Sequence, residues 1–270
     1  MNAILCYGSL CADLRIWLPH WPRQGSGIHA VRTRWLAGGN ALNEARALVS
    51  WGAQPLLYGD RLGYDTGGDL VAAELTALGL MTHIERSANV ATPVCHILIT
   101  PDGERTIIAL RQQTAASPPS AEVLATCQIV SVSRYGLYTT EVATTARQLN
   151  RLVVVGDVSD PADPLAQAAD IIVTSVDRSG VDPFQQAVTL QQVRGAPVFV
   201  TDGPRSARVL VAGTWYEAMP PSTVSSDLTG AGDVFRAGVV YGVWKGWDWQ
   251  EILAFATNAA TTFVIEQATA

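Results

Sequence analysis

A glycine-rich segment near the C-terminal end of the chain combines residue types suited to phosphate chemistry. Residues 227–238 read Asp-Leu-Thr-Gly-Ala-Gly-Asp-Val-Phe-Arg-Ala-Gly. The glycines allow a sharp turn and a close approach of the backbone to a ligand. The apolar run Val234–Trp244 then predicts a buried helix, whose first amide N–H groups have no acceptor within the helix and attract an anion such as phosphate. We therefore expect an anion site at this turn, with Asp233 beside it in the first turn of the helix.

Asp233 is the candidate for chemistry at this turn. A carboxylate beside a phosphate site is electrostatically unfavourable, so its presence there suggests that it has a function. It could accept a proton from an attacking hydroxyl while the amides stabilise the charge on a transferring phosphoryl group. The motif by itself fits an ordinary helix cap equally well, since Asp and Gly are both common there. The turn alone leaves both interpretations open.

Two other glycine motifs that bind phosphates are absent from the sequence. There is no Gly-x-x-x-x-Gly-Lys-Ser/Thr segment, which excludes a Walker A loop. Phe235 stands where Gly-x-Gly-x-x-Gly has its third glycine, and the motif lies late in the chain instead of opening a nucleotide-binding domain. The segment is therefore not a dinucleotide-binding fingerprint.

Length and composition describe a globular protein with a large core. The chain has 270 residues, of which 48% are hydrophobic and only 16% are charged. This is enough for one large α/β domain and argues against disorder. The net charge of −6 gives no electrostatic footprint for nucleic acid, so an anionic ligand must be held locally by amides and a few cations.

Cysteine usage and the N-terminal residues favour a cytoplasmic protein. The cysteines at positions 6, 11, 95 and 127 have neither the Cys-x-x-Cys spacing of a zinc or redox site nor the density of a disulfide scaffold, so we expect reduced thiols. Met1–Gly8 reads as a first strand and not as a signal peptide. We expect no membrane span, because no run of ~18 apolar residues occurs.

Short apolar runs alternate with helix-like segments along the chain. Six runs bounded by Gly, Asp or Pro read as buried strands: Ile4–Cys6, Pro55–Tyr58, Gln128–Val132, Leu152–Val155, Ile171–Val173 and Pro197–Val200. The helix-like segments are Asn40–Trp51, Asp69–Leu78 and Glu141–Leu149. Strands that alternate with helices predict an α/β fold, a parallel sheet with helices on both faces.

Two segments do not fit this alternation. Trp17–Leu36 is rich in Trp, Arg, Pro and Gly and alternates like a strand near its end. Pro93–Leu110 reads as a hairpin with its turn at residues 101–104. We expect both in a small accessory sheet that stands off the main domain. The arginines of this region are expected on a solvated face, with contact to an anionic substrate as the alternative: Arg15, Arg23, Arg32 and Arg34.

Three motifs, in order along the chain, resemble the signatures of the ribokinase-like (PfkB) carbohydrate kinases. The glycine turn at 227–238 is similar to the C-terminal signature of that family. Residues 38–45, Gly-Gly-Asn-Ala-Leu-Asn-Glu-Ala, resemble the N-terminal signature, and residues 59–67 resemble a further glycine- and aspartate-containing stretch. The resemblance runs from about Leu5 to the end of the chain. It is specific to the family and not to one substrate.

The resemblance implies a doubly wound, mostly parallel sheet flanked by helices, with a small β-sheet lid. It places residues 1–270 in a single kinase domain and the lid at about residues 14–36 and 93–110. Family members commonly pair through that lid, which makes a homodimer an expectation to test. The implied cofactors are ATP and Mg²⁺. The implied partner is a small sugar-like substrate, with no nucleic acid and no membrane involved.

The resemblance also assigns roles to individual positions. Asp233 matches the catalytic base, and the amide anion hole matches Gly230, Ala231 and Gly232. The positions that match substrate contacts are Asp13, Gly39 and Asn43. Without the resemblance, Asp13 reads as a surface-loop residue and Asn43 as a capping or helix-surface residue. Nucleotide contacts match Thr201 and Gly203, while Asn258 and, equally well, Thr257 align with the expected adenine pocket.

Two regions depart from the family pattern. Where the family has Asn-x-x-Glu after a strand, this chain has Ser175 and Arg178, which leaves the placement of Mg²⁺ open. Ser175 stays a candidate nucleotide contact, Asp177 could replace the glutamate one position early, and Arg178 could meet a phosphate or lie in solvent. Arg134 stands where ribokinases place a carboxylate near the sugar. It fits either an anionic or ketose-type substrate or a simple cation at a strand end.

The sequence therefore predicts a carbohydrate kinase, an ATP-dependent enzyme that transfers the γ-phosphate to a hydroxyl of a sugar or sugar-like molecule. One alternative is a nucleoside or keto-acid/ketose kinase of the same family. Another is a catalytically impaired homologue that only binds ligand. The altered residues at 175 and 178 favour this last alternative, whereas the intact Asp233 and its glycine turn oppose it.

Overall fold

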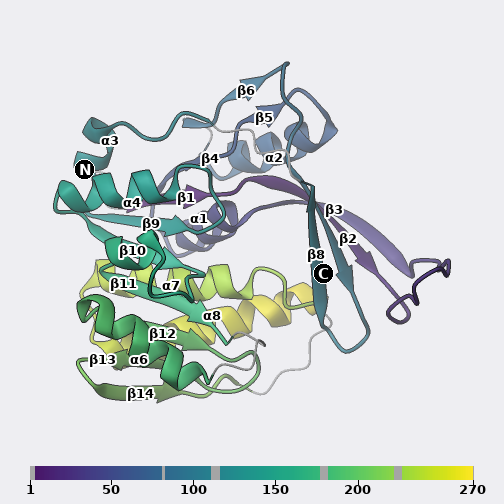
Figure 1. The fold of residues 1–270 in the computed structure, drawn as a ribbon. Helices are drawn as coiled ribbons and strands as arrows, with labels where there is room; N and C mark the ends of the chain where they lie inside the picture. The colour runs from purple at the N-terminus through teal and green to yellow at the C-terminus, as the bar shows by residue number, and fades with distance from the viewer. Residues whose placement is uncertain (1–3, 81–82, 111–115, 177–181, 222–226, 270) are drawn as a thin grey trace.

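The fold centres on an eight-stranded sheet with the strand order β14-β13-β12-β11-β10-β9-β1-β4 (Figure 1). The computed structural model describes residues 4–80, 83–110, 116–176, 182–221 and 227–269. The strands are β1 Ile4–Gly8, β4 Leu56–Gly59, β9 Ile129–Ser133, β10 Leu152–Gly156, β11 Ile171–Ser175, β12 Val198–Thr201, β13 Ala207–Val211 and β14 Thr214–Ala218. In this order, the neighbouring strands β4, β1, β9, β10, β11 and β12 run parallel to one another. At the β12 edge the sheet is extended by β13 and β14, which pair antiparallel.

All six strands predicted from apolar runs are present, and they form the parallel part of the sheet. Helices cover both faces, so these strands are buried throughout most of their length, as in β9, where every residue is buried. The hairpin of β13 and β14 was not predicted. Its outer strand is largely exposed, and its turn at Ala212 and Gly213 has φ values of 46° and 79°, as two-residue hairpin turns require.

The helices divide into two layers, one on each face of the sheet. The first hydrophobic cluster contains residues of α1 Asn40–Ser50, α2 Thr66–Ala77, α7 Ala231–Lys245 and α8 Trp249–Thr269. The second contains residues of α3 Ala121–Ala125, α4 Thr139–Gln148, α5 Pro164–Ala168 and α6 Pro183–Arg194. The predicted doubly wound α/β architecture is confirmed. Among the described helices, none combines the length and the hydropathy needed to cross a membrane.

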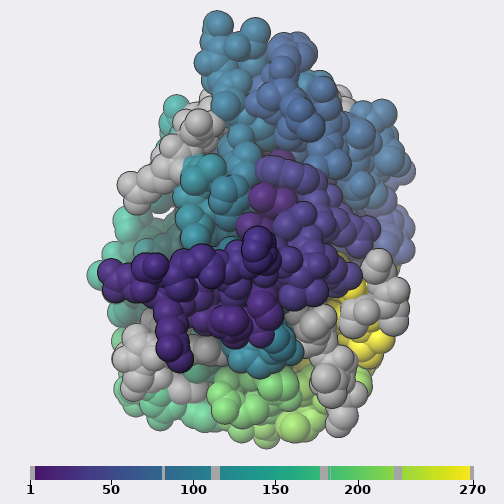
Figure 2. All heavy atoms as spheres, turned by 90° about the vertical axis from the view of Figure 1, so that its right-hand side faces the viewer, coloured from purple at the N-terminus to yellow at the C-terminus, as the bar shows by residue number. Residues whose placement is uncertain are grey.

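A separate four-stranded sheet projects from one side of this core, at the right of Figure 1. Its order is β3 Arg32–Gly38, β2 Cys11–Trp17, β7 Val94–Ile99 and β8 Arg105–Leu110. The hairpin predicted within Pro93–Leu110 is confirmed as β7 and β8. Figure 2 faces this side of the molecule, where the purple N-terminal part of the chain spreads across the middle of the surface. A short pair, β5 Leu62–Gly63 with β6 Arg86–Ser87, lies apart from both sheets.

Arg15 corrects the expectation that the arginines of the small sheet face solvent. It lies in β2 and is buried, and its guanidinium donates to Oδ2 of Asp227 over 2.6 Å and to the side chain of Gln267. Arg32 and Arg34 are exposed as expected. The buried ion pair thus connects the small sheet to the first residue of the glycine-rich turn, although the two are 212 positions apart.

The strand order places a topological switch beside β1. The chain runs from β1 to β4 on one side of it and later adds β9 on the other side. At such a point the connections leave a crevice at the carboxyl ends of the strands, where doubly wound proteins bind their ligands. Residues that follow β1, β9 and β10 therefore lie at the edge where a site is expected.

Candidate active site

The glycine turn is folded as its sequence predicts. Helix α7 begins at Ala231, directly after Gly230, whose φ of 88° favours glycine. A Cβ at Gly230 would lie 3.3 Å from Asn43 Nδ2 and from the ring of Phe263, so the turn is also closely packed. Asp233 follows in the first helical turn.

Gly232 is a glycine that packing does not require. It has no positive φ, and a Cβ built there meets nothing within 4 Å. The space beside its backbone is therefore open, as a site for a close-approaching ligand needs. The Ala231 amide makes a long bond of 3.3 Å to the Leu228 carbonyl, whereas the amides of Gly232 and Asp233 occupy helix positions that have no intrahelical acceptor. Among the described residues, none accepts a hydrogen bond from the backbone amide of Gly232 or Asp233, so these are the two amides that could meet an anion at this turn.

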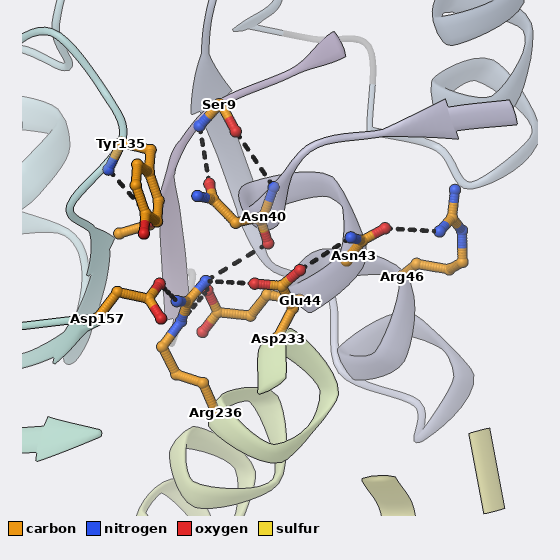
Figure 3. A network of polar contacts seen from close by, with 10 residues as sticks. Ser9, Asn40, Asn43, Glu44, Arg46, Tyr135, Asp157, Asp233 and Arg236 are labelled. Atoms are coloured by element: carbon orange, nitrogen blue, oxygen red, sulfur yellow. Dashed lines mark hydrogen bonds and ion pairs between the residues drawn. The ribbon is translucent and has the colours of Figure 1, made fainter. Parts of the chain in front are cut away.

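Asp233 and Asn43 are brought together from the two signature motifs. The Asn43 side-chain amide donates to Oδ2 of Asp233 over 2.8 Å (Figure 3). Asn43 lies on α1, and its own Oδ1 accepts a hydrogen bond of 3.1 Å from Arg46. Asn43 is therefore neither a cap nor a free surface residue, because both ends of its side chain have partners inside the fold.

A buried arginine contacts three carboxylates, one of which is that of Asp233 (Figure 3). Arg236 lies 3.1 Å from Glu44, 3.6 Å from Asp157 and 3.7 Å from Asp233, measured between guanidinium nitrogens and carboxylate oxygens. The Arg236 side chain is 2% exposed and that of Glu44 is 0% exposed, so this pair is enclosed by protein. A Cβ at Gly156 would lie 2.2 Å from the guanidinium, which explains the glycine at the end of β10.

Burial and these neighbouring charges together set the pKa of Asp233. Burial raises its pKa to about 7, and the negative charges of Asp157 and Glu44 act in the same direction. The positive charge of Arg236 and the hydrogen bond from Asn43 oppose that rise. A carboxyl group with a pKa near 7 is deprotonated in about half of the molecules at neutral pH and binds a proton more readily than an ordinary carboxylate, which suits a general base.

Glu44, Asp157 and Arg236 were missed by the sequence reasoning, although each left a signal. Glu44 directly follows Asn43 in one signature, and Arg236 lies inside the other. Asp157 directly follows β10, and the residues after parallel strands share one edge of the sheet. The opposite charges of Glu44 and Arg236, one in each signature, could have suggested an ion pair between the two segments.

Asp13 lies in a strand and not in a surface loop. It belongs to β2 and is 5% exposed, and burial raises its pKa to about 6 against the hydrogen bond from the Cys11 thiol and the charges of Arg15 and Arg46. Its carboxylate lies against Gly38, where a Cβ would be 2.0 Å from Oδ2. The first glycine of the Gly38-Gly39 pair therefore makes room for this carboxylate.

The second glycine of that pair starts helix α1. Gly39 has a φ of 101°, and a Cβ there would lie 2.3 Å from the carbonyl oxygen of Ser9. Asn40 Oδ1 in turn accepts a hydrogen bond of 2.8 Å from the Ser9 amide. The segment after β1, which leads to Asp13, is thereby held against the start of α1, which carries Asn43.

The segment after β9 carries Arg134 and Tyr135 to the same edge. Arg134 is exposed directly after the strand. The pKa of the Tyr135 phenol is raised by partial burial and then by the negative charge of Asp157, with Asp233 contributing as well, so the phenol lies near both carboxylates. Figure 3 shows Tyr135 beside Asp157. Tyr135 was not proposed from the sequence.

The expected nucleotide side lies further along the same edge. Ser175 and Thr201 are register partners at the ends of β11 and β12, and Gly203 follows two residues later with a φ of 55°. On α8 the side chain of Asn258 is exposed, while Thr257 is buried and donates to the Leu253 carbonyl. The two departures named at Asp177 and Arg178 lie outside the described residues.

Comparison with known proteins identifies the family of the chain. Residues 1–270 match the model of the pfkB family carbohydrate kinase. The ribokinase of Bacillus subtilis (strain 168) is 25% identical over 276 residues, covering 98% of this chain and 93% of that protein. The ketohexokinase of Mus musculus is 26% identical over 294 residues, covering 95% and 94%.

A solved structure agrees at the level of the fold. The structure of Arabidopsis thaliana ribokinase complexed with ribose and ATP aligns with a TM-score of 0.81 at 22% identity, over 98% of this chain and 93% of that one. At that identity the alignment establishes the fold alone. The enzyme class is established by the family match over the whole length. The chain belongs to the pfkB family of carbohydrate kinases.

Proposed function

We propose that this protein transfers the γ-phosphate of ATP to a hydroxyl of a sugar or sugar-like molecule, with Asp233 as the general base. The observation that carries the proposal is the Asp233 carboxyl group at the open N-terminus of α7, with a pKa of about 7 and a 2.8 Å hydrogen bond from Asn43. A solvated capping aspartate has no need of such an enclosure. The family membership makes phosphoryl transfer the expected chemistry.

In this mechanism the acceptor hydroxyl lies between the two halves of the site. Asp13, Gly39 and Asn43 hold the acceptor, and Asp233 takes the proton of the attacking hydroxyl as the bond to phosphorus forms. The turn formed by Gly230, Ala231 and Gly232 lines the anion hole, where the backbone amides of Gly232 and Asp233 stabilise charge on the transferring phosphoryl group. The helix N-terminus favours that negative charge further.

On the donor side, Ser175, Thr201 and Gly203 lie at the strand ends along which the nucleotide would extend, with Asn258 as the proposed adenine contact. Mg²⁺ is expected to accompany the nucleotide, because it neutralises phosphate charge in phosphoryl transfer. Asp157 fits this ion in chemistry, since it offers a carboxylate oxygen and its side chain is 37% exposed.

The acceptor class is narrowed by Arg134. Its exposed guanidinium follows β9 at the substrate edge and suits an anionic or ketose-type acceptor, which it could hold with a planar fork. A nucleoside or keto-acid/ketose acceptor remains the alternative within the family. A catalytically impaired binding protein fits less well, because Asp233, Asn43 and the open Gly232 together retain the expected machinery.

The small sheet is proposed to act as a lid and as a dimer contact. Large apolar side chains are exposed on its two edge strands: Trp35, Ile107, Ile108 and Leu110 are 49%, 51%, 48% and 47% exposed. Edge strands with such side chains are ready to pair with another sheet. A second copy of the chain would cover them.

The kinase proposal is tested by ATP consumption over a panel of sugars, ketoses, sugar acids and nucleosides with Mg²⁺. For the accepted substrate, we expect Asp233→Asn to lower kcat by roughly 10²–10⁴-fold or more, the contribution typical of a general base. Nucleotide affinity, measured by calorimetry, should not fall, because the substitution removes a negative charge beside the phosphate site. Turnover by Asp233→Asn equal to the wild type, or no turnover with any member of the panel, would contradict the mechanism.

A further inference from the structure

Two cysteines and an aspartate meet on one face of the small sheet. Cys11 and Asp13 are two residues apart on β2, so their side chains point to the same face. Cys95 lies on β7 directly opposite Asp13 in the register of the two strands. The pairing brings together cysteines that are 84 positions apart, which is why no Cys-x-x-Cys spacing marks them in the sequence.

The distances among these groups are those of ligands around one metal ion. Cys11 Sγ lies 3.7 Å from Cys95 Sγ and 3.2 Å from Asp13 Oδ1, and the three ligand atoms lie within 4.8 Å of one another. Zinc–thiolate bonds of about 2.3 Å at a tetrahedral angle put two sulfurs about 3.8 Å apart. The observed separation of the sulfurs therefore already matches one edge of such a tetrahedron.

Burial and charge favour a bound ion over a solvated cluster. Cys11 is 4% exposed and Asp13 is 5% exposed, while Cys95 is less enclosed and leaves an open side for entry. The two cations that act on Asp13 have carboxylate partners of their own. Arg15 pairs with Asp227 at 2.6 Å and Arg46 with Glu74 at 2.8 Å, so much of their charge is compensated.

We propose that Cys11, Asp13 and Cys95 form a binding site for a thiophilic divalent cation such as Zn²⁺. The bound ion then occupies the Asp13 carboxylate and blocks its contact with the substrate. Three protein ligands leave a fourth, open position for water, and both thiols release their protons when the ion binds. The inhibitory part rests on the proposed function, because it takes Asp13 as a contact to acceptor hydroxyls. An ion on Asp13 competes with the acceptor and not with ATP.

Metal binding is tested first, without reference to activity. The full-length protein, reduced and freed of metal, is titrated with Co²⁺ and with Zn²⁺, and the thiolate-to-cobalt charge-transfer absorption is recorded. We expect this absorption in the wild type and its loss in Cys11→Ser and Cys95→Ser, with Zn²⁺ affinity weakened at least about tenfold on loss of a ligand. Cys127→Ser removes a buried thiol of the second hydrophobic cluster, away from the small sheet. It should leave the absorption and the Zn²⁺ affinity unchanged.

The inhibitory part is tested by steady-state kinetics once an acceptor is known. Zn²⁺ should raise the KM for the acceptor without lowering kcat, and Cys95→Ser should abolish that rise. An absorption unchanged in Cys95→Ser, no absorption in the reduced wild type, or oxidation of the pair to a disulfide as the only reaction of these thiols would overturn the site. Inhibition competitive with ATP would overturn its mode of action. Because the titration needs no substrate, a failed kinase assay leaves the metal result readable.

Discussion

Asn43 donates a 2.8 Å hydrogen bond to Asp233 and thereby joins two segments that are 190 residues apart in the chain. Arg46 donates to the oxygen end of the same amide, so the nitrogen end has to face Asp233. The orientation of the proposed base is thus set from α1 and not by α7 alone. Substitutions in one helix are therefore expected to change the chemistry of the other.

The first prediction concerns pH. Because the pKa of Asp233 is about 7, raised chiefly by burial, its proton is lost as pH rises through neutrality. A general base works only when deprotonated, so kcat/KM should increase over roughly pH 6–8. Asp157→Asn removes a negative charge that raises this pKa, so the titration midpoint of Asp233, followed by NMR in the metal-free protein, should move to lower pH. The measurement is kcat/KM for the acceptor as a function of pH, at saturating MgATP.

A matched control for that shift is Glu122→Gln, which removes the same charge from an exposed position on α3. Its profile should overlay that of the wild type, because exposed distant charges are screened by salt. If Asp157→Asn moved the midpoint upward, or if both variants moved it equally, the assignment of the titrating group to Asp233 would be wrong.

The second prediction concerns the buried pair of Arg236 and Glu44. Arg236→Met leaves the carboxylate of Glu44 buried without its partner, which typically costs about 3–5 kcal/mol. It also removes the positive charge that lowers the pKa of Asp233, so the activity midpoint should move to higher pH. Urea unfolding and the kcat/KM profile measure the two effects separately.

The double variant Glu44→Gln/Arg236→Met separates the ion pair from its surroundings. With both charges gone, stability should recover by at least about 1 kcal/mol relative to Arg236→Met, since no unpaired charge is buried. An additive loss in the double variant would show that the two residues act independently and would contradict the pairing seen at 3.1 Å.

The third prediction separates a functional glycine from a packing glycine in the same helix. A Cβ at Gly232 meets nothing within 4 Å, whereas one at Gly238 would lie 2.6 Å from Ala256 Cα. Gly232→Ala should keep or slightly raise stability, because Ala favours a helix over Gly by roughly 1 kcal/mol. It should nevertheless lower kcat/KM for ATP, since the methyl group enters the space of the transferring phosphate.

Gly238→Ala is the matched comparison, with the opposite pattern. It should lower the melting temperature because the methyl group forces α7 away from α8, and the folded fraction should keep its KM for ATP. Normal ATP kinetics in Gly232→Ala would remove the main argument for an anion hole at this turn.

Much of the fold could be predicted from the sequence, because its strongest signals are local. Val- and Ile-rich runs between glycines and prolines mark strands that are buried on both faces, and all six were found. Strand β2 was missed because Cys11–Trp17 mixes small, charged and apolar residues, and its pairing with β7 is non-local. For the same reason Asp13 could be named but not placed, and Arg15 was taken for a solvated residue.

The site was predictable where it coincides with a turn and not where it depends on packing. Asp233 and Gly232 could be identified because glycines precede the predicted start of a helix. Two partners of Arg236, Glu44 and Asp157, come from other segments of the chain, and only the fold shows that they meet it. The cysteine pair is hidden in the same way, since its geometry arises from strand register.

The last prediction concerns Gly39, where α1 meets the segment that leads to Asp13. Its φ of 101° and the 2.3 Å approach of a Cβ to the Ser9 carbonyl predict that Gly39→Ala is destabilising on two counts. Gly52→Ala shares the positive φ, 81°, but meets no atom within 4 Å, so it reports the backbone strain alone, about 1–2 kcal/mol. Gly39→Ala should cost about 1–3 kcal/mol more in urea unfolding, the usual range for a forced contact. Because relief of that contact separates α1 from Ser9, the KM for the acceptor should rise as well. Equal stability and equal KM in the two variants would mean that Gly39 serves the turn only and does not shape the substrate site.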